Sequence, residues 1–582
     1  MMKLSAQSKD LSQENIKKVE ELFPNCVTES YDKDGNLVRS IDFDVLRQDL
    51  SGHVVEGQKE RYQFNWPGKR EAILLANAPT TNTLRPLPEK SVDFENTKNV
   101  YIEGDNLEAL KILRETYMGK IKMIYIDPPY NTGNDFVYKD DFKESTEEYL
   151  KSSGNIDEEG NRMAVNGESN GRFHSDWLNM MYPRLILARD LLTDDGLIFI
   201  SIGNQEIDNL KKMLSEIFGD SCFLGIIDWE SKTKCQNTDT AKRQLQNKQE
   251  YILVFEKTSH RYEFNLRTIS KRDYPEIDEN GKRFRYEQIG EMASSGTRGR
   301  QSMVFDILGV LPKPGNQWKF GTQTINLFLS RNDLVRKNDK VFFRLRPEDE
   351  EDKMEPFWSF YSKEIGTGET AKSELKKIVG SGEFETVKPV SLIEDLAFHV
   401  LNDGDIILDF FSGSGTTAAS TMKLNAEQNL HCKYVLVQIP ESFTSSSVSS
   451  FSTLCDLGEY RIKKTAEKIE TDFPLESETM DLGFRVFKTD SSNMKDILDT
   501  PKDTQLNLLE DADSAIKPDR NSLDLVTQVM LQLGITLDAE IKIGKCAGGG
   551  GNIRPLTAMT SSAVSIRTFP NPISRKSLGC SL

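Results

Sequence analysis

Short apolar runs alternate with amphipathic stretches in two parts of the chain. YIEGDNLEALKIL, which starts at Tyr101, predicts a strand, a Gly-Asp turn and a helix. Further apolar runs predict buried strands in KMIYIDPPY, which becomes polar at Asp127, and in GLIFISI and QEYILVFEK. SDWLNMMYPRLILARDLL predicts a helix with Ser175 as its N-terminal cap. The alternation returns from Asp405 in DIILDFFSGSGTTAASTMKL and KYVLVQI, so both parts predict the same type of architecture.

This alternation predicts an α/β fold, with a doubly wound, mostly parallel sheet and helices on both faces. Between the two parts the pattern changes to short strand-like pieces such as KVFFRL and turns such as ENGK and KPGN, which predict an inserted domain. The expected divisions are an N-terminal region, the first half of the α/β core, the insert, the second half of the core and a C-terminal region: residues 1–99, 100–257, 258–385, 386–487 and 488–582.

The composition changes again from about residue 545. This tail contains CAGGGG, is rich in Gly, Ser and Thr, and has almost no acidic residues. One hypothesis is a disordered tail. Another is a reading-frame change that replaced the natural C-terminus, which an intact frame through this stretch of the gene would exclude.

The chain of 582 residues has a net charge of −17, which at first argues against a nucleic-acid partner. The charge is unevenly distributed, because residues 225–346 contain 23 Lys and Arg against 15 Asp and Glu. Their balance is therefore +8, and the remainder of the chain carries −25. A localised DNA-facing segment and a random scatter of surface charge explain this pattern equally well.

Sequence features that direct a protein to membranes or to secretion are not apparent. No apolar run approaches the roughly 20 residues of a membrane span, and MMKLSAQSKDLSQENIKK lacks the apolar core of a secretory signal. The seven cysteines are scattered without a CxxC pair, which indicates neither a zinc site nor a disulfide framework. We therefore expect a cytoplasmic protein with no membrane partner and no metal.

The motif Asp127-Pro128-Pro129-Tyr130 follows an apolar strand, at the sheet edge where α/β proteins bind ligands. Two prolines fix the backbone and remove two N–H donors. The Pro128 carbonyl and the Asp127 carboxylate are then two acceptors side by side, which suits an amine that donates two hydrogen bonds. The Tyr130 ring can stack on a planar base. The alternative is a Pro-Pro turn that only ends a strand.

A second motif leads from a strand through a glycine turn into a helix: Asp409-Phe410-Phe411-Ser412-Gly413-Ser414-Gly415-Thr416-Thr417. Glycines let a ligand approach the backbone, and a helix N-terminus offers free N–H groups to a carboxylate. The dinucleotide pattern is absent, because Ala418 stands where its third glycine would, and no GK[ST] of a Walker loop follows. Taken alone, the turn is equally compatible with a dinucleotide site or with a tight strand-to-helix connection.

The DPPY motif combined with Phe411, Gly413 and Gly415 resembles the amino-methyltransferases that act on DNA. DPPY precedes the glycine turn here, with a basic insert between them, an order that resembles the beta class of these enzymes. Long stretches between residues 15 and 500 further resemble the modification (Mod) subunit of type III restriction–modification systems: KREAILLANAPTTNTLRP, YIEGDNLEALKIL, MIYIDPPYNTGNDFVYKDDF, NGRFHSDWLNMMYPRL and KPVSLIEDL. This resemblance implies a permuted, Rossmann-like DNA methyltransferase that uses S-adenosylmethionine.

The resemblance also implies cofactor contacts in three segments: Gly104 and Asp105 beside the adenine moiety, Lys388, Pro389 and Ser391 beside the methionine moiety, and Asp409, Phe411, Gly413, Gly415 and Thr416 in the main turn. In many such enzymes an acidic residue after the next strand holds the ribose. VLVQIPE places Gln438 at that position and Glu441 three residues later, so the ribose ligand stays open between them. Gly203 and Asn204 also stand where acidic residues are expected.

A mechanism follows from the resemblance. The target adenine leaves the duplex by base flipping, and Asp127 and the Pro128 carbonyl accept both hydrogens of its N6 amine, which is then methylated without a metal. The insert is the expected recognition domain for double-stranded DNA. Its candidate contacts are basic residues: Lys271, Arg272, Arg298 and Arg300. A restriction (Res) subunit and a second Mod chain in a homodimer are the implied protein partners.

Three other hypotheses stay open. An N4-cytosine DNA methyltransferase has the same fold, although serine more often precedes its two prolines than an aspartate such as Asp127. Methyltransferases of protein glutamine side chains use Asn-Pro-Pro-Tyr, but they place the cofactor turn first and lack a large insert. A non-catalytic DNA-specificity protein would need neither an intact Asp127 nor the intact glycines.

Overall fold

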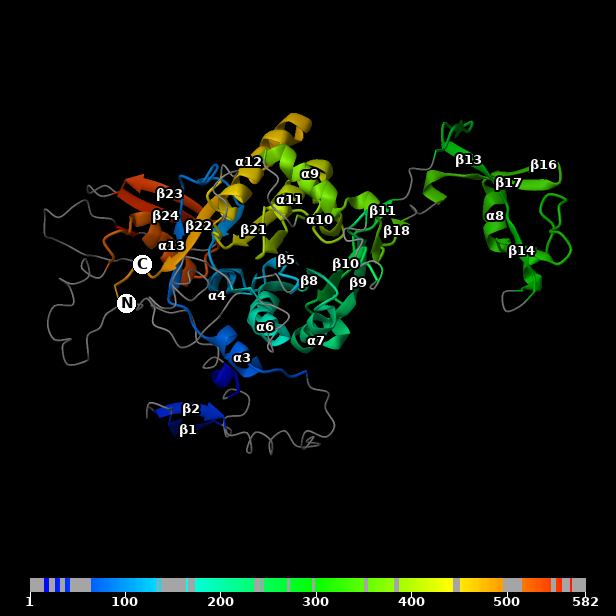
Figure 1. Ribbon diagram of the computed structural model, residues 1–582. Coiled ribbons are helices and arrows are strands. Elements are labelled where there is room, and N and C mark those ends of the chain that lie inside the picture. The colour runs from blue at the N-terminus through cyan, green and yellow to red at the C-terminus, as the bar shows by residue number, and fades with distance from the viewer. Residues whose placement is uncertain are drawn as a thin grey trace. The chain divides into compact units, whose positions relative to one another are not determined.

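The computed structural model describes the following residues: 15–19, 27–31, 37–41, 64–132, 136–137, 164–165, 173–234, 242, 245–268, 273–295, 299–349, 354–380, 387–442, 451–495, 516–545, 551–556 and 566–567. The chain divides into two compact units (Figure 1). Leu266–Phe357 form the smaller unit, and the chain on both sides of this segment forms the larger one.

The larger unit is built on a ten-stranded sheet with the order β19-β9-β10-β8-β5-β20-β21-β4-β22-β3. Its strands are β3 (Asn82–Pro86), β4 (Val100–Glu103), β5 (Ile121–Ile126), β8 (Leu192–Ile202), β9 (Phe223–Glu230), β10 (Gln249–Glu256), β19 (Phe360–Tyr361), β20 (Ile406–Asp409), β21 (Lys433–Gln438) and β22 (Arg485–Ser491). Only the pairs of β10 with β8, β10 with β9 and β22 with β3 are antiparallel. The predicted doubly wound, mostly parallel sheet is therefore confirmed.

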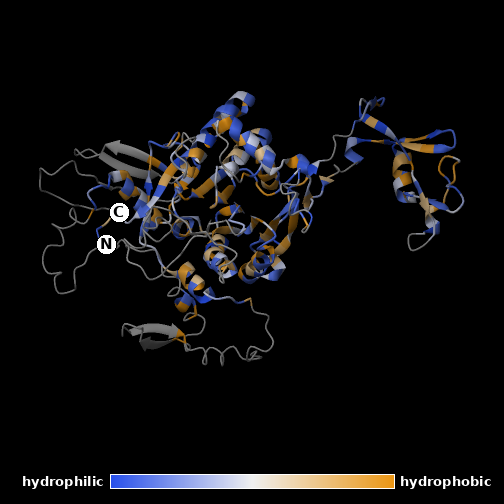
Figure 2. Cartoon of the chain, in the orientation of Figure 1, coloured by the Kyte–Doolittle hydropathy of each residue, from blue (hydrophilic) through white to orange (hydrophobic). Residues whose placement is uncertain are grey.

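Helices cover both faces of this sheet (Figure 1). One group packs together on one face: α3 (Lys69–Asn77), α4 (Asn106–Tyr117), α6 (Phe173–Leu191), α7 (Ile207–Phe218) and α13 (Ser522–Gln532). The other group consists of α9 (Gly368–Val379), α10 (Val390–Phe398), α11 (Thr416–Gln428) and α12 (Leu454–Asp472). Many helices have one hydrophobic and one hydrophilic side (Figure 2). Because both faces are covered, every residue of β4 and β5 is buried, which explains why their sequences are mostly apolar.

Helix α6 begins at Phe173, upstream of the predicted cap, so the expected start at Ser175 is wrong. The Phe173 carbonyl accepts a hydrogen bond of 3.2 Å from the Asn131 side chain. This contact connects the start of α6 to the segment that follows DPPY, and it could not be read from the local sequence. By contrast, α11 begins at Thr416, as the sequence predicts.

The direction of winding reverses between β20 and β5. From β20 the chain passes through α11 to β21 on one side, and from β5 it continues to β8 on the other. Leu408 of β20 is in register with Ile124 of β5, so the carboxyl ends of these strands meet at one edge. Ligands of open α/β sheets bind at such a switch point. DPPY follows β5 there, and the glycine turn follows β20.

The smaller unit has its own core. Its elements are a sheet of β12 (Glu276–Ile277), β13 (Arg283–Gln288), β17 (Lys340–Leu345) and β16 (Leu334–Lys337), a pair of β14 (Glu291–Ala293) and β15 (Asn316–Trp318), a pair of β11 (Arg267–Thr268) and β18 (Met354–Glu355), and helix α8 (Thr322–Ser330). Phe328 of α8 stacks on Phe343 of β17 with ring centroids 4.7 Å apart. One face of the sheet is therefore packed against the helix.

This unit is shorter than the insert of residues 258–385 that the sequence suggests. After it, β19 joins the large sheet as a parallel neighbour of β9, and α9 packs on α12. Before it, the Asn265 side chain donates hydrogen bonds to the carbonyls of Phe398 and Leu401. These contacts attach both flanks of the insert to the larger unit, although their sequence texture differs from that of its strands.

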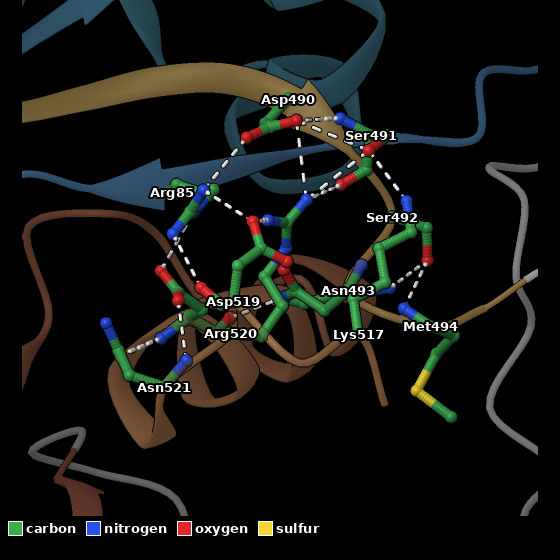
Figure 3. Close-up of polar contacts among 12 residues, drawn as sticks. Arg85, Asp490, Ser491, Ser492, Asn493, Met494, Lys517, Asp519, Arg520 and Asn521 are labelled. Atoms are coloured by element: carbon green, nitrogen blue, oxygen red, sulfur yellow. Dashed lines mark hydrogen bonds and ion pairs between the residues drawn. The ribbon is translucent and has the colours of Figure 1, made fainter. Parts of the chain in front are cut away.

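A polar network holds the C-terminal helix region against the edge of the sheet (Figure 3). Arg85 of β3 contacts Asp490 of β22 at 3.1 Å and Asp524 at the start of α13 at 3.5 Å. Arg520, whose side chain is buried, lies 3.4 Å from the second oxygen of Asp490. Because α13 is fixed in this way, the C-terminal region contributes to the fold well beyond residue 487.

The remaining described strands form small separate pairings: β1 (Val27–Tyr31) with β2 (Leu37–Ile41), β6 (Phe136–Val137) with β7 (Ala164–Val165), and β23 (Glu540–Lys545) with β24 (Gly551–Leu556) and β25 (Ile566–Arg567). Most of the tail after residue 545 lies outside the described residues, so both hypotheses on it stay predictions.

Among the residues that the structure describes, no helix has the length and apolarity that crossing a membrane requires.

Candidate functional site

The carboxylate of Asp127 is bound by a lysine from a distant segment. Lys388, two residues before α10, donates to both Asp127 oxygens from its Nζ atom, at 2.7 and 2.6 Å. The two side chains are 8% and 22% exposed, so water screens this ion pair only weakly. The resemblance assigned Lys388 to the methionine moiety of the cofactor, whereas the structure brings its ammonium onto the DPPY carboxylate.

A second carboxylate, that of Glu250 at the start of β10, lies beside this pair. The Tyr130 hydroxyl donates to Glu250 Oε2 at 2.9 Å, and Lys388 Nζ lies 3.5 Å from the same oxygen. Lys388 Nζ is also 5.0 Å from the centroid of the Tyr130 ring and 5.9 Å from that of Trp229. One ammonium thus lies between two carboxylates and two aromatic rings, which leaves this cluster with a net charge of −1 when all three groups are ionised.

Burial shapes the ionisation of the cluster. Burial raises the pKa of Asp127, while the charge and the hydrogen bonds of Lys388 lower it, with a net rise. Burial lowers the pKa of Lys388, but Asp127 and Glu250 raise it more, so the ammonium form is favoured. Lys388 is therefore the main group that keeps Asp127 an acceptor.

The DPPY backbone is held by side chains of the α6 and α7 region. Trp177 Nε1 donates to the Pro129 carbonyl at 2.8 Å. Asn131, which follows DPPY in a left-handed conformation, donates from its amide to the buried carboxylate of Glu206 at 2.6 Å. A Cβ atom at Gly203 would lie 3.1 Å from the Tyr130 ring, so glycine allows this ring to pack closely. The buried carboxylate nearest to Gly203 in sequence is Glu206, three residues later.

The glycine turn is stabilised by Asp409 at the end of β20. The Asp409 carboxylate accepts hydrogen bonds from Phe411 N at 3.0 Å and from the Thr417 hydroxyl at 2.5 Å. Burial raises the pKa of Asp409 to about 7, although these two hydrogen bonds oppose the rise. The side chain therefore spans the turn and joins its first residues to the beginning of α11.

Gln438, at the end of β21, supports the same turn from the neighbouring strand. Its Oε1 accepts from Gly413 N at 2.7 Å, and its Nε2 donates to the Ile439 carbonyl at 3.2 Å. Both ends of this amide are therefore engaged in protein contacts. Gly413 and Gly415 have φ values of 51° and 77°, which other residues adopt only with strain.

Arg461 of α12 contacts the turn from the protein interior. Its side chain is buried, and Nη1 donates to Ser414 Oγ and Thr416 Oγ1 at 2.7 Å each. Burial lowers the pKa of Arg461 to about 10. The hydroxyl of Thr416, an expected cofactor ligand, is thus an acceptor for this guanidinium and anchors the start of α11.

The remaining expected cofactor ligands differ in the hydrogen bonds that they already make within the protein. Gly104 N donates to the Gln438 carbonyl at 2.9 Å, and a Cβ atom at Gly104 would lie 2.3 Å from Thr489 Oγ1. Asp105 caps α4 with hydrogen bonds from the backbone N–H groups of residues 107 and 108, at 2.9 and 3.1 Å. Ser391 Oγ donates to the carbonyl of residue 365. Glu441 is half-buried after β21.

The structure therefore gathers the DPPY residues, Lys388 and the glycine turn at one sheet edge, and places Gly104, Gln438 and Glu441 at or just after the ends of the adjoining strands. Sequence reasoning missed four contributors to this edge: Glu250, Trp177, Glu206 and Arg461. Glu250 looks like an ordinary polar strand start, and Arg461 like one of several charged positions of α12, so no local signal distinguished them. Within the described part of the chain, no cluster of three or more His, Cys, Asp or Glu residues is arranged to hold a metal ion.

Comparisons with known proteins identify the family of this chain. Residues 121–463 match the DNA methylase family. The StyLTI Mod subunit of a type III restriction–modification enzyme from Salmonella typhimurium is 30% identical over 79% of this chain and 71% of its own length. The corresponding EcoP15I subunit from Escherichia coli is 29% identical and the EcoPI subunit from Escherichia phage P1 is 31% identical, each over 80% of this chain and 76% of the relative.

The matched range contains both DPPY and the glycine turn, together with Lys388, Glu250 and Arg461. It also includes the inserted unit, so the relationship extends over both units of the chain. The chain belongs to the DNA methylase family and, within it, to the Mod subunits of type III restriction–modification enzymes.

Proposed function

We propose that this chain methylates the N6 amine of adenine within a specific sequence of double-stranded DNA, with S-adenosylmethionine as methyl donor. The observation that carries the proposal is the meeting of DPPY and the glycine turn at the switch point of the sheet. The aspartate of DPPY favours adenine over cytosine, because serine is more common at that position in N4-cytosine enzymes. Family membership supplies the reaction class, methyl transfer to DNA.

The residues of the glycine turn fit S-adenosylmethionine. Ser412 Oγ is buried and has no hydrogen-bond partner among the described residues, as expected of a group that awaits a polar ligand. The N-terminus of α11 provides N–H groups for the carboxylate of the methionine moiety. The net negative cluster of Asp127, Glu250 and Lys388 complements a sulfonium cation. When bound, this cofactor supplies an electrophilic methyl group.

Ligand roles follow from the contacts that each side chain already makes. The turn from Asp409 to Thr416 holds the cofactor through its backbone and Ser412, because the Asp409 and Thr416 side chains are engaged in holding the turn itself. Gly104 and Asp105 border the adenine moiety in the same way, since the Asp105 carboxylate caps α4. We assign the ribose to Glu441, because both ends of the Gln438 amide are used by the protein. Pro389 and Ser391 border the methionine moiety.

The DPPY residues orient the target base. The Asp127 carboxylate and the Pro128 carbonyl accept the two hydrogens of the amine, which directs the nitrogen lone pair away from them. The Tyr130 ring, fixed through its hydroxyl on Glu250, stacks on the flipped base. Positioning of this kind contributes up to about 7–11 kcal/mol in favourable reactions.

We assign recognition of the DNA sequence to the smaller unit. The sheet face opposite α8 carries Tyr286, Phe342 and Lys337, and Lys337 Nζ lies 3.9 Å from the centroid of the Tyr286 ring. Basic and aromatic groups on one open face suit phosphates and bases. Of the four candidates from the sequence, Lys271, Arg272 and Arg298 lie outside the described residues, and Arg300 is exposed.

The partners of the chain follow from its membership among type III Mod subunits. A Res subunit is the partner that the family implies, and we further propose that two Mod chains form a homodimer. Size-exclusion chromatography with light scattering tests this point directly, since a single-chain mass for the purified protein at micromolar concentration would contradict it.

The decisive experiment is to sequence, with modification-sensitive reads, DNA from a methylation-free host that expresses this chain. N6-methyladenine on one strand of a short asymmetric motif supports the proposal. N4-methylcytosine instead would overturn the assignment of the target base while leaving the DNA methyltransferase activity.

A Lys337→Glu variant, compared with Lys464→Glu on α12, tests whether the sheet face that carries Tyr286, Phe342 and Lys337 binds DNA. Only Lys337→Glu is expected to weaken DNA binding.

A further inference from the structure

The acceptor group that the proposed function assigns to the target amine is occupied in this structure by another nitrogen. Lys388 Nζ lies at hydrogen-bond distance from both Asp127 oxygens. An ammonium donates up to three hydrogen bonds and accepts none, so toward a carboxylate it resembles an amine that donates two. An adenine amine that reaches Asp127 therefore competes with Lys388 for an oxygen that the ammonium already occupies.

A second position for the lysine is already within reach. Glu250 Oε2 lies 3.5 Å from Lys388 Nζ, and the Tyr130 hydroxyl holds this carboxylate in place. The faces of Tyr130 and Trp229 border the same ammonium at distances typical of cation–π contacts. Lys388 can thus exchange one carboxylate for another without leaving the buried cluster, which avoids the cost of an unpaired buried charge.

We propose that Lys388 is a positioning residue that holds Asp127 ionised and aligned until the target amine arrives, and then transfers its hydrogen bonds to Glu250. The inference rests on the proposed function. In this scheme Lys388 occupies Asp127 in place of the amine. When the amine arrives, Glu250 becomes the carboxylate that binds the Lys388 ammonium. Neither residue has to touch the methyl group.

The charges around Asp127 explain why such a placeholder is needed. Tyr125, Tyr130, Glu250 and Asp409 lie close enough to Asp127 to interact with its charge, and both Glu250 and burial favour its protonated form. A protonated Asp127 would present a hydroxyl donor to the donors of the amine, which is unproductive. Lys388 is the cation that opposes this protonation, and it stays beside the site after it moves to Glu250.

The test is the pH dependence of kcat for methylation of a duplex that contains the target site, at saturating S-adenosylmethionine. In Lys388→Met the acidic limb of the profile should move upward by about one to three pH units, so that activity lost at neutral pH returns at higher pH. Lys388→Arg keeps the charge and should keep the limb near its wild-type position. Glu250→Gln removes a negative neighbour but keeps an acceptor for Tyr130, and it should move the limb downward.

Opposite shifts in the Met and Gln variants support the inference. A Lys388→Met enzyme with an unchanged profile, or one that binds DNA but stays inactive up to pH 10, would overturn it. If Lys388→Met does not fold, Glu250→Gln decides alone, since an unshifted limb refutes the exchange. A wild-type enzyme that does not methylate adenine refutes the proposed function instead, so the two failures are distinguishable.

Discussion

The two strand ends that meet at the switch point are stabilised in opposite ways. After β20, the glycine turn is held by Asp409, Gln438 and Arg461, each of which bonds directly to the turn or to the first residues of α11. After β5, Asp127 is bound by Lys388, which also lies near the second carboxylate of Glu250. The first end has fixed partners, whereas the second has a partner that can be exchanged.

This difference matches what the two ends have to do. A turn that binds a cofactor through its backbone gains affinity from being rigid before the ligand arrives, because less ordering is left to oppose binding. A carboxylate that receives a base amine has to stay ionised while it is empty, and it also has to release its temporary partner. Rigidity at one end and exchange at the other should therefore be alterable independently by substitutions at each end.

The largest expected effect comes from Asp127→Ala. Loss of the acceptor should lower the methylation rate by roughly 10² to 10³-fold, the range seen when one preorganised hydrogen-bonding group is removed. Cofactor affinity should change much less than the rate, because the glycine turn is held by other residues and only one charge near the sulfonium is lost. Single-turnover methylation and calorimetric titration of S-adenosylmethionine measure the two effects. An active Asp127→Ala enzyme would show that this end does not orient the amine.

The converse change is Gln438→Leu. It leaves the Gly413 N–H without its acceptor, at a cost of about 1–3 kcal/mol, which should appear as a weaker cofactor affinity. The rate at saturating cofactor should stay close to wild type. Gln438→Glu is the matched control, since it keeps an oxygen at the same place. A lower methylation rate at saturating cofactor, with an unchanged cofactor Kd, would contradict the proposal that the glycine turn governs cofactor affinity and the DPPY end governs the rate.

Asp409→Asn tests how the turn responds to pH. Because the pKa of Asp409 is raised to about 7 in the fold, its stabilising contribution is complete below the usual carboxyl range and is lost as pH rises through 7. The wild-type Tm should therefore fall between pH 5 and 7 more steeply than that of Asp409→Asn, by about 2–4 °C for each kcal/mol. Parallel Tm curves for the two proteins would contradict this origin of the pH dependence.

The smallest effect is expected for Trp177→Phe. This change removes the hydrogen bond to the Pro129 carbonyl but keeps an aromatic ring in the core, so about 0.5–1.5 kcal/mol of support for DPPY is lost. A rate decrease of a few-fold with unchanged cofactor affinity is the expected result. A change in cofactor affinity alone would show that the DPPY end and the glycine turn are mechanically coupled.

Much of the site could be predicted from local sequence. The apolar runs before Asp127 and Asp409 are strands, and α11 starts at Thr416 after the glycines, since these features depend on residues close in the chain. The ends of the insert were less accessible, because the strand partner of β19 and the carbonyls bound by the Asn265 side chain lie more than 130 residues away in sequence. Glu250 and Arg461 carried no local signal, because their partners also lie on other elements, far outside a local sequence window.

Local sequence was enough to predict the α/β alternation and the two motifs that carry the family resemblance, since hydrophobic period, glycine positions and the proline pair act over a few residues. The contacts of those motifs depend instead on how distant segments pack. The order of the sheet brings Lys388 and Glu250 to Asp127, and burial then makes their charges interact strongly. The hydrophobic period indicates which side of a helix or strand is buried. The residues that pack against that side are set by segments that lie far apart in the chain.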